Sequence, residues 1–183
     1  MLVARHYHHL LDGAAIVLNV PRPVHIVVGL DWAANASQRT WMERLCRAAE
    51  YPIVLRTSTL DASPAYTRAD LGRYTRAAFR ETTRLLREER VVLVFPEGYP
   101  NIDPAGTRKP GSDDWLPFQE GFLRMIERAE RDGRTHVALV PVGFSYARVA
   151  SAGGERWSIA ARIGMPLATR TLAEIEAAVK VLS

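Results

Sequence analysis

Apolar and polar positions along this chain follow two periods, one typical of strands and one typical of helices. Short apolar runs predict strands over residues 24–30, 52–56, 91–95, 137–144 and 157–163. Apolar positions three or four apart predict helices over residues 37–50, 66–89 and 119–132, and a last helix that opens with a Thr171–Glu174 capping box. This alternation predicts an α/β fold, with a mixed central sheet flanked by helices, in a single domain over residues 1–183.

The strand at residues 91–95 is the most informative of these elements. Four aliphatic residues and a phenylalanine indicate full burial, Pro96 stops the strand, and Glu97 and Gly98 follow at its carboxyl end. Ligands of open α/β sheets bind at this edge, so the Glu97 carboxylate is a candidate functional group. Gly98 would allow positive φ or a close approach of a ligand to the backbone.

Residues 99–117 are expected to form a long proline- and glycine-rich loop beside that strand end. Loops of this length more often have a functional role than not. Trp115 and Phe118 near its end have two interpretations. They either insert into a membrane interface as a wedge or pack over the core.

The helix predicted over residues 66–89 carries a stripe of arginines without obvious partners on its own helix. The stripe is either a solvated face or a surface for anionic headgroups or an acidic carrier protein. Its members are Arg73, Arg76, Arg80, Arg84 and Arg87.

Composition narrows the class of protein. A net charge of +4 favours anionic partners, and Cys46, the single cysteine, lies in an apolar helical pattern and is interpreted as core. The apolar stretch over residues 10–20 contains Asp12 and is too short to span a bilayer. A histidine cluster starting at His6 leaves no room for a signal peptide. We therefore expect a cytoplasmic protein, peripheral at most on the inner face of the cell membrane.

The histidine cluster consists of His6, His8 and His9, and it precedes Asp12. If a helix begins near His8, then His8 and Asp12 share a helical face, and the carboxylate can orient the imidazole as a general base. A surface patch and a metal site are the alternatives. The two histidines left to complete a metal site, His25 and His136, are better explained as structural.

Several short motifs in the chain resemble those of a known family. Phe95-Pro-Glu-Gly98 is the signature of glycerolipid acyltransferases of the lysophosphatidate acyltransferase (PlsC-like) type. Four further segments resemble blocks of that family in the same order, so the resemblance covers most of residues 5–167. They are Pro52-Ile-Val-Leu-Arg56, Phe118-Gln-Glu-Gly-Phe-Leu-Arg124, Val140-Pro-Val-Gly-Phe144 and Ile163-Gly-Met-Pro-Leu167.

Three departures from the family pattern qualify the resemblance. The family separates its histidine and aspartate by four residues, and that spacing from Asp12 falls on Tyr7, between His6 and His8. We favour His8 as the base, with His6 as the competing choice. The arginine that usually follows the glutamate and glycine is missing. The chain also begins without the N-terminal helices that many relatives use to sit on membranes.

The resemblance implies an enzyme that moves a fatty acyl group from an acyl-CoA or acyl-carrier-protein thioester to a lysophospholipid-like acceptor such as 1-acylglycerol-3-phosphate. It implies no cofactor and no metal. Glu97 and Gly98 would position the acceptor or the catalytic loop. Phosphate contact would fall to Arg56, Arg108 and Lys109.

A non-catalytic lipid- or anion-binding relative and a metal-dependent hydrolase remain as alternatives. A nucleic-acid partner is not expected, because the basic stripe has no interleaved aromatic residues for base stacking.

Overall fold

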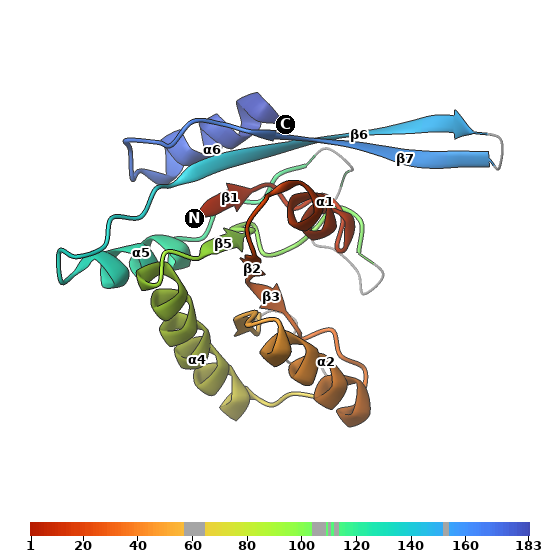
Figure 1. Ribbon diagram of the computed structural model, residues 1–183. Coiled ribbons are helices and arrows are strands. Elements are labelled where there is room, and N and C mark those ends of the chain that lie inside the picture. Colours follow the sequence, from red (N-terminus) through yellow and green to blue (C-terminus); the bar gives the residue numbers. More distant parts are fainter. Residues whose placement is uncertain (57–64, 104–108, 110, 112–113, 152–153) are drawn as a thin grey trace. The chain divides into compact units, whose positions relative to one another are not determined.

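The structure, a computed structural model, describes residues 1–56, 65–103, 109, 111, 114–151 and 154–183 (Figure 1). The chain forms two compact units. Unit 1 contains Met1–Arg22, Phe95–Glu120 and Ala138–Ser183, and unit 2 contains Pro23–Val94 and Gly121–Val137. The expected candidate residues fall in both units.

Unit 1 is organised around a long hairpin of β6 (Val140–Ser151) and β7 (Gly154–Ile163), which pair antiparallel (Figure 1). The short strand β1 (Leu2–Ala4) pairs parallel with β6, with Leu2 opposite Val140. The helix α1 (Leu11–Asn19) lies against β7, and α6 (Leu172–Leu182) lies against β6. The mixture of parallel and antiparallel pairs is therefore present within unit 1 itself.

The close packing of α6 on β6 depends on a glycine. A Cβ atom built on Gly143 would lie 2.1 Å from the backbone carbon of Leu182 and 2.3 Å from its oxygen. Backbone cannot move aside as a flexible side chain can, so only glycine lets the end of α6 approach the strand this closely.

Unit 2 contains two parallel strand pairs covered by helices. The strand β2 (Val24–Ile26) pairs with β5 (Val91–Val94), and β3 (Val28–Gly29) pairs with β4 (Ile53–Val54). Its helices are α2 (Ala36–Ala48), α4 (Arg68–Arg87) and α5 (Gly121–Glu130), and α4 packs against α5, β4 and β5. Together the two units confirm the predicted α/β class.

Several strand predictions differ from the structure, and the strand expected over residues 137–144 runs from Val140 to Ser151. The expected strand over residues 24–30 is divided because the chain changes partner: Val27 N donates to Leu93 O, and Val28 N donates to Pro52 O. The strand β1 was not predicted, because three apolar residues at a chain start give no periodicity to read.

Helix starts follow local side-chain chemistry. Thr67 and Asp70 form a capping box that opens α4, and Asn35 accepts a hydrogen bond from Gln38 N at the start of α2. The last helix does begin after Thr171, but the predicted capping box is wrong. The Glu174 carboxylate instead accepts the hydroxyl groups of Thr169 and Thr171.

Within the described ranges, no helix has both the length and the apolar character needed to cross a bilayer.

Candidate active site

The loop between β1 and α1 carries the histidine cluster, and the Asp12 side chain holds this loop in place. Asp12 lies in the first turn of α1 and is fully buried. Its Oδ2 accepts the backbone N–H groups of Tyr7 at 2.7 Å and His8 at 3.0 Å. Hydrogen bonds from main-chain N–H groups to a carboxylate are among the stronger ones in proteins. Asp12 therefore fixes the main chain of this loop at Tyr7 and His8.

The His6 ring is the imidazole that reaches this carboxylate. Its Nδ1 lies 2.9 Å from Asp12 Oδ2, and the ring stacks on Phe95 with centroids 4.2 Å apart. The His6 side chain is 16% exposed, and among the described residues its Nε2 has no hydrogen-bond partner. With Nδ1 as the donor to Asp12, Nε2 carries the lone pair, which is the arrangement of an oriented general base.

His8 does not occupy the position that was expected of it. The helix begins at Leu11 and not near His8, so the two residues do not share a helical face. The His8 Nδ1 accepts the backbone N–H groups of Leu10 at 3.2 Å and Leu11 at 3.3 Å, and its ring stacks on His9. Partial burial and the neighbouring His9 lower the pKa of His8, against the opposing charge of Asp12. The structure therefore gives the orienting contact with Asp12 to His6.

Glu97 is buried and fixes the His6 main chain from one side. Its Oε1 accepts His6 N at 2.9 Å, and its Oε2 accepts Leu116 N at 3.0 Å. Gly98, with φ of +74°, forms the turn that follows the strand end, as its N–H donates to Phe95 O. Glu97 thus contacts the loop that carries the histidines, and its expected roles in positioning the acceptor or the catalytic loop stay predictions.

Lys109 fixes the same main chain from the other side. Its ammonium group lies 2.6 Å from Glu97 Oε2 and donates to His6 O and Asn101 Oδ1, each at 2.9 Å. Burial lowers the pKa of Lys109, and the Glu97 carboxylate opposes that shift. An ammonium group has three protons, and protein oxygens accept all three here. The phosphate contact expected of Lys109 stays a prediction, and this geometry gives the residue a structural task instead.

Tyr146 is a site residue that sequence reasoning missed. It lies on β6, its hydroxyl donates to Asp12 Oδ1, and its ring stacks on Tyr7 with centroids 4.4 Å apart. Burial and the charge of Asp12 raise the pKa of Tyr146, so it remains a donor. Strand alternation could have indicated it. Alternate residues of a strand face the same side, so Tyr146 lies on the side of the buried residues Val142 and Phe144.

The remaining expected phosphate ligands are placed differently. Arg56 belongs to unit 2, where its Nε lies 2.8 Å and 3.0 Å from the two oxygens of the buried Asp31. Arg108 lies outside the described residues. Acceptor binding by either residue stays a prediction.

The loop aromatics pack inward, as the second of their two interpretations held. Phe118 is buried, and the partly buried Trp115 ring lies under two cations, with Arg5 at 4.4 Å and Lys180 at 5.3 Å from its centroid. A membrane wedge built on Trp115 and Phe118 is therefore wrong.

The arginine stripe of α4 also needs correction, because several of its members have acidic partners. Arg84 pairs with Glu81 on α4, with Glu88 at its C-cap and with Glu50, and Arg73 pairs with Asp70. These contacts describe a solvated face with ion pairs rather than a row of unpaired cations.

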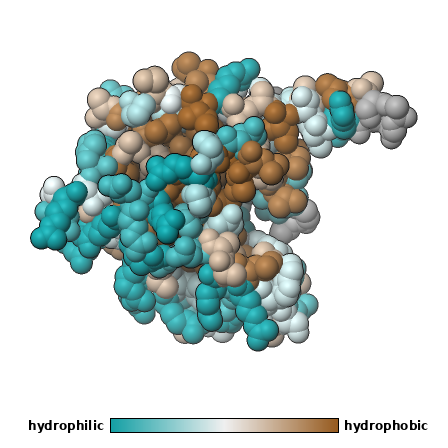
Figure 2. Space-filling view, in the orientation of Figure 1, coloured by the Kyte–Doolittle hydropathy of each residue, from teal (hydrophilic) through white to brown (hydrophobic). Residues whose placement is uncertain are grey.

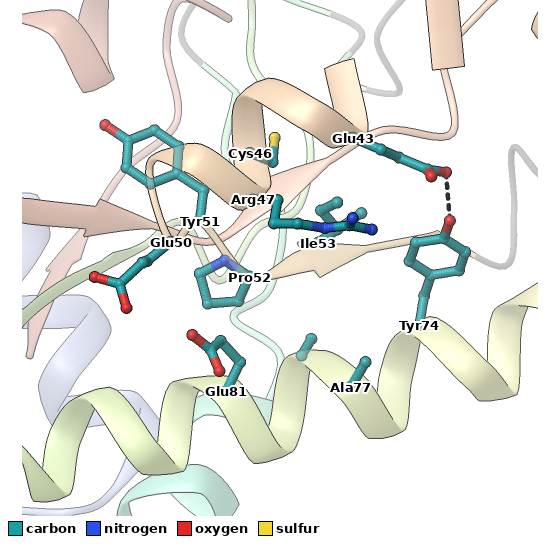
Figure 3. Close-up of a pocket in the computed structure, with 11 residues that line it drawn as sticks. Glu43, Cys46, Arg47, Glu50, Tyr51, Pro52, Ile53, Tyr74, Ala77 and Glu81 are labelled. Carbon is teal, nitrogen blue, oxygen red and sulfur yellow. Dashed lines mark hydrogen bonds between the residues drawn. The ribbon is translucent and has the colours of Figure 1, made fainter. Parts of the chain in front are cut away.

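A cavity of about 340 Å³ in unit 2 is lined by none of the residues predicted for the site (Figure 3). Its lining comes from α2, β4 and α4, and it includes Cys46 and Tyr74. Burial raises the pKa of the Cys46 thiol to about 11, which agrees with its interpretation as core. Within the described part of the chain, no group of three or more His, Cys, Asp or Glu side chains is arranged to hold a metal ion.

Comparison with known proteins agrees with the sequence motifs. A family model described as Acyltransferase matches residues 1–145, which include the histidine loop and the Phe95-Pro-Glu-Gly98 motif. The match ends within β6, one residue before Tyr146. The chain belongs to this family, which is that of the PlsC-like glycerolipid acyltransferases. A search of the curated proteins found no match to the chain.

Proposed function

We propose that the protein transfers an acyl group from an acyl thioester to an acceptor hydroxyl, with His6 as the general base and Asp12 as the residue that orients it. One observation carries this proposal. The Nδ1 of His6 is held 2.9 Å from a buried carboxylate, while its Nε2 is left without a partner among the described residues. Membership of the acyltransferase family supports the reaction class.

The proposed step uses the free nitrogen of His6. Nε2 takes the proton of the acceptor hydroxyl as that oxygen attacks the thioester carbonyl carbon. The new C–O bond forms, the C–S bond breaks, and the proton on the imidazole passes to the leaving thiolate. Asp12 stabilises the imidazolium in between, and such general-base help increases a rate by roughly 10²–10⁴.

The substrates we propose are a fatty acyl-CoA or acyl-carrier-protein donor and a lysophospholipid-like acceptor such as 1-acylglycerol-3-phosphate. This assignment would place the protein in phospholipid biosynthesis, at the cytoplasmic face of a membrane, and it requires no cofactor. The net charge of +4 supports an acceptor that carries a phosphate. Arg56 and Arg108 remain the proposed phosphate contacts.

The test compares His6→Ala with His8→Ala in purified protein given a labelled acyl thioester and a panel of lysophospholipids and simple alcohols. His6→Ala should lower turnover by roughly 10²–10⁴ while the circular dichroism spectrum and melting temperature stay close to those of the parent. His8→Ala is the matched control and should change turnover far less.

The same experiment separates the alternatives. Wild-type protein that binds the lysophospholipid without forming product would indicate a non-catalytic relative. Release of free fatty acid that stops on addition of a chelator would indicate a metal-dependent hydrolase.

A further inference from the structure

The outward side of α1 is apolar where a surface helix is normally polar. We define the outer face of α1 as Leu10, Val17 and Leu18, whose exposed fractions are 63%, 42% and 83%. Val17 and Leu18 follow Leu10 by seven and eight residues, so the three lie on one side of the helix. Asp12 and Ile16, one turn apart, are buried on the opposite side.

This face carries no charge. Asp12 is the only ionisable residue between Leu10 and Val20, and it is buried. Figure 2 shows brown apolar surface gathered where Figure 1 labels α1. Single exposed apolar side chains are common, but three on one uncharged helix face need an explanation.

An aromatic and cationic pair lies on the hairpin that packs against α1. Trp157 is on β7, and the Arg148 guanidinium lies 5.0 Å from the centroid of its ring. Arg148 and Trp157 are opposite each other across the hairpin, on the side that also carries Tyr146. Tryptophan and arginine are typical of protein surfaces that lie in the headgroup region of a bilayer.

We infer that the outer face of α1 docks on an anionic lipid bilayer, with Trp157 and Arg148 at the headgroup level. This inference rests on the proposed function, because the proposed donor and acceptor both carry acyl chains. Docking there would bring the bilayer to the same helix whose inner side holds Asp12 against His6. The net charge of +4 complements anionic headgroups.

Two other occupants fit the surface less well. A stable dimer buries roughly 800 Å² on each partner, which is far more than three side chains can supply. An acidic carrier protein needs a broad basic surface, whereas Arg148 is the single cation among the five side chains proposed for docking. A lipid surface needs neither a large area nor charge on the helix itself.

The test is vesicle flotation with the double variant Leu10→Gln/Leu18→Gln. Vesicles contain phosphatidylcholine and phosphatidylglycerol in equal parts, or phosphatidylcholine alone. The double variant should bind the mixed vesicles at least about tenfold more weakly than wild type, because the removed apolar side chains no longer enter the interface. Arg148→Gln should weaken binding to the mixed vesicles by about fivefold and leave binding to neutral vesicles nearly unchanged.

The matched control is Val181→Gln, which changes a side chain that is 86% exposed on α6. It should alter vesicle binding by less than about twofold. Wild-type binding that the double variant retains would overturn the inference, as would failure of wild type to bind either vesicle. A concentration-dependent dimer that the double variant breaks, without any change in vesicle binding, would assign the face to a second copy and also overturn it.

This test is independent of catalysis. His6→Ala should float with vesicles like wild type even when it transfers no acyl group. Loss of turnover therefore tests the proposed reaction, and loss of flotation tests the outer face of α1.

Discussion

Two buried aspartates in this molecule have different partners. Asp12 in unit 1 accepts hydrogen bonds from two backbone N–H groups, the His6 ring and the Tyr146 hydroxyl. Asp31 in unit 2 lies against the Arg56 guanidinium, whose Nε is within 3.0 Å of both its oxygens. The Arg56 charge is permanent, whereas the donors around Asp12 are neutral groups and an imidazole that can gain a proton.

Because of this difference, we expect one aspartate to contribute mainly to catalysis and the other mainly to folding stability. A carboxylate already neutralised by a guanidinium gains little from a further positive charge nearby. The Asp12 carboxylate stabilises positive charge on His6 when the imidazole takes a proton, so its interaction is strongest during the proposed reaction. We therefore expect substitutions at Asp12 to act mainly on turnover and substitutions at Asp31 to act mainly on folding.

The largest expected effect is that of Asp12→Asn on turnover. Asparagine has nearly the same shape but no charge, so it would neither favour the required imidazole tautomer nor stabilise the imidazolium. We expect kcat to fall by roughly 10²–10⁴, measured with labelled thioester under saturating acceptor. In the double variant His6→Ala/Asp12→Asn the losses should not add, because both residues act through one imidazole. A loss of less than about tenfold for Asp12→Asn would contradict the proposed role.

Arg56→Met should act on stability instead. It leaves Asp31 buried without its guanidinium partner, and breaking a buried ion pair in this way costs about 3–5 kcal/mol of unfolding free energy. Urea denaturation measures this loss. Arg73→Met is the matched control, because Arg73 pairs with Asp70 on an exposed helix face, and it should cost less than about 1 kcal/mol.

Substrate kinetics of Arg56→Met test whether Arg56 also binds the acceptor, in addition to its contact with Asp31. If Arg56 also binds the acceptor phosphate, KM should rise for a phosphorylated acceptor and stay unchanged for a simple alcohol. Equal KM values for wild type and Arg56→Met with both acceptors would limit Arg56 to its contact with Asp31.

Local patterns predicted much of the fold. The helices expected over residues 37–50 and 66–89 correspond to Ala36–Ala48 and Arg68–Arg87. Their apolar spacing and their caps depend on residues close together in the sequence, so both could be predicted. The division between β2 and β3 was missed, since Val27 and Val28 bond to different distant partners. No local pattern reports such a change of partner.

The residues of the candidate site were chosen from the sequence, but the contacts between them could not be predicted from it. The motif located Glu97 and the cluster located the histidines, yet the choice between His6 and His8 depends on a loop that Asp12 shapes through main-chain hydrogen bonds. Side-chain spacing alone could not show those bonds. Tyr146 is 134 residues from Asp12, and only the tertiary fold brings the two together.

An intermediate effect is expected for Lys109→Met, which removes the ammonium group between Glu97 and His6 O. The buried Glu97 carboxylate would lose its ammonium partner, and breaking a buried ion pair in this way costs about 3–5 kcal/mol in unfolding free energy. Because the His6 main chain would then be held from one side only, kcat should fall about tenfold. Lys180→Met is the control, since Lys180 pairs with Glu176 on an exposed helix face. Unchanged kcat in Lys109→Met would show that Glu97 alone fixes His6.

The smallest effect is expected for Tyr146→Phe. Tyr74 in unit 2 provides the matched comparison, because it also donates to a carboxylate. Tyr146 donates to Asp12, and Tyr74 in unit 2 donates to Glu43 (Figure 3). Burial is the main cause that raises the pKa of each phenol, and the nearby carboxylate adds to it. Because the folded pKa is raised, the stabilisation is fully present below the unfolded value of about 10 and is lost as the pH rises above it.

Both Tyr146→Phe and Tyr74→Phe should therefore reduce the loss of stability between neutral pH and pH values above about 10, measured by urea denaturation across that range. Only Tyr146→Phe should also lower kcat, by about fivefold, because only Tyr146 holds the carboxylate that orients His6. Equal kcat values for the two variants would show that Asp12 keeps its position without the phenol. The contribution of Tyr146 would then be to folding alone, as that of Tyr74 is expected to be.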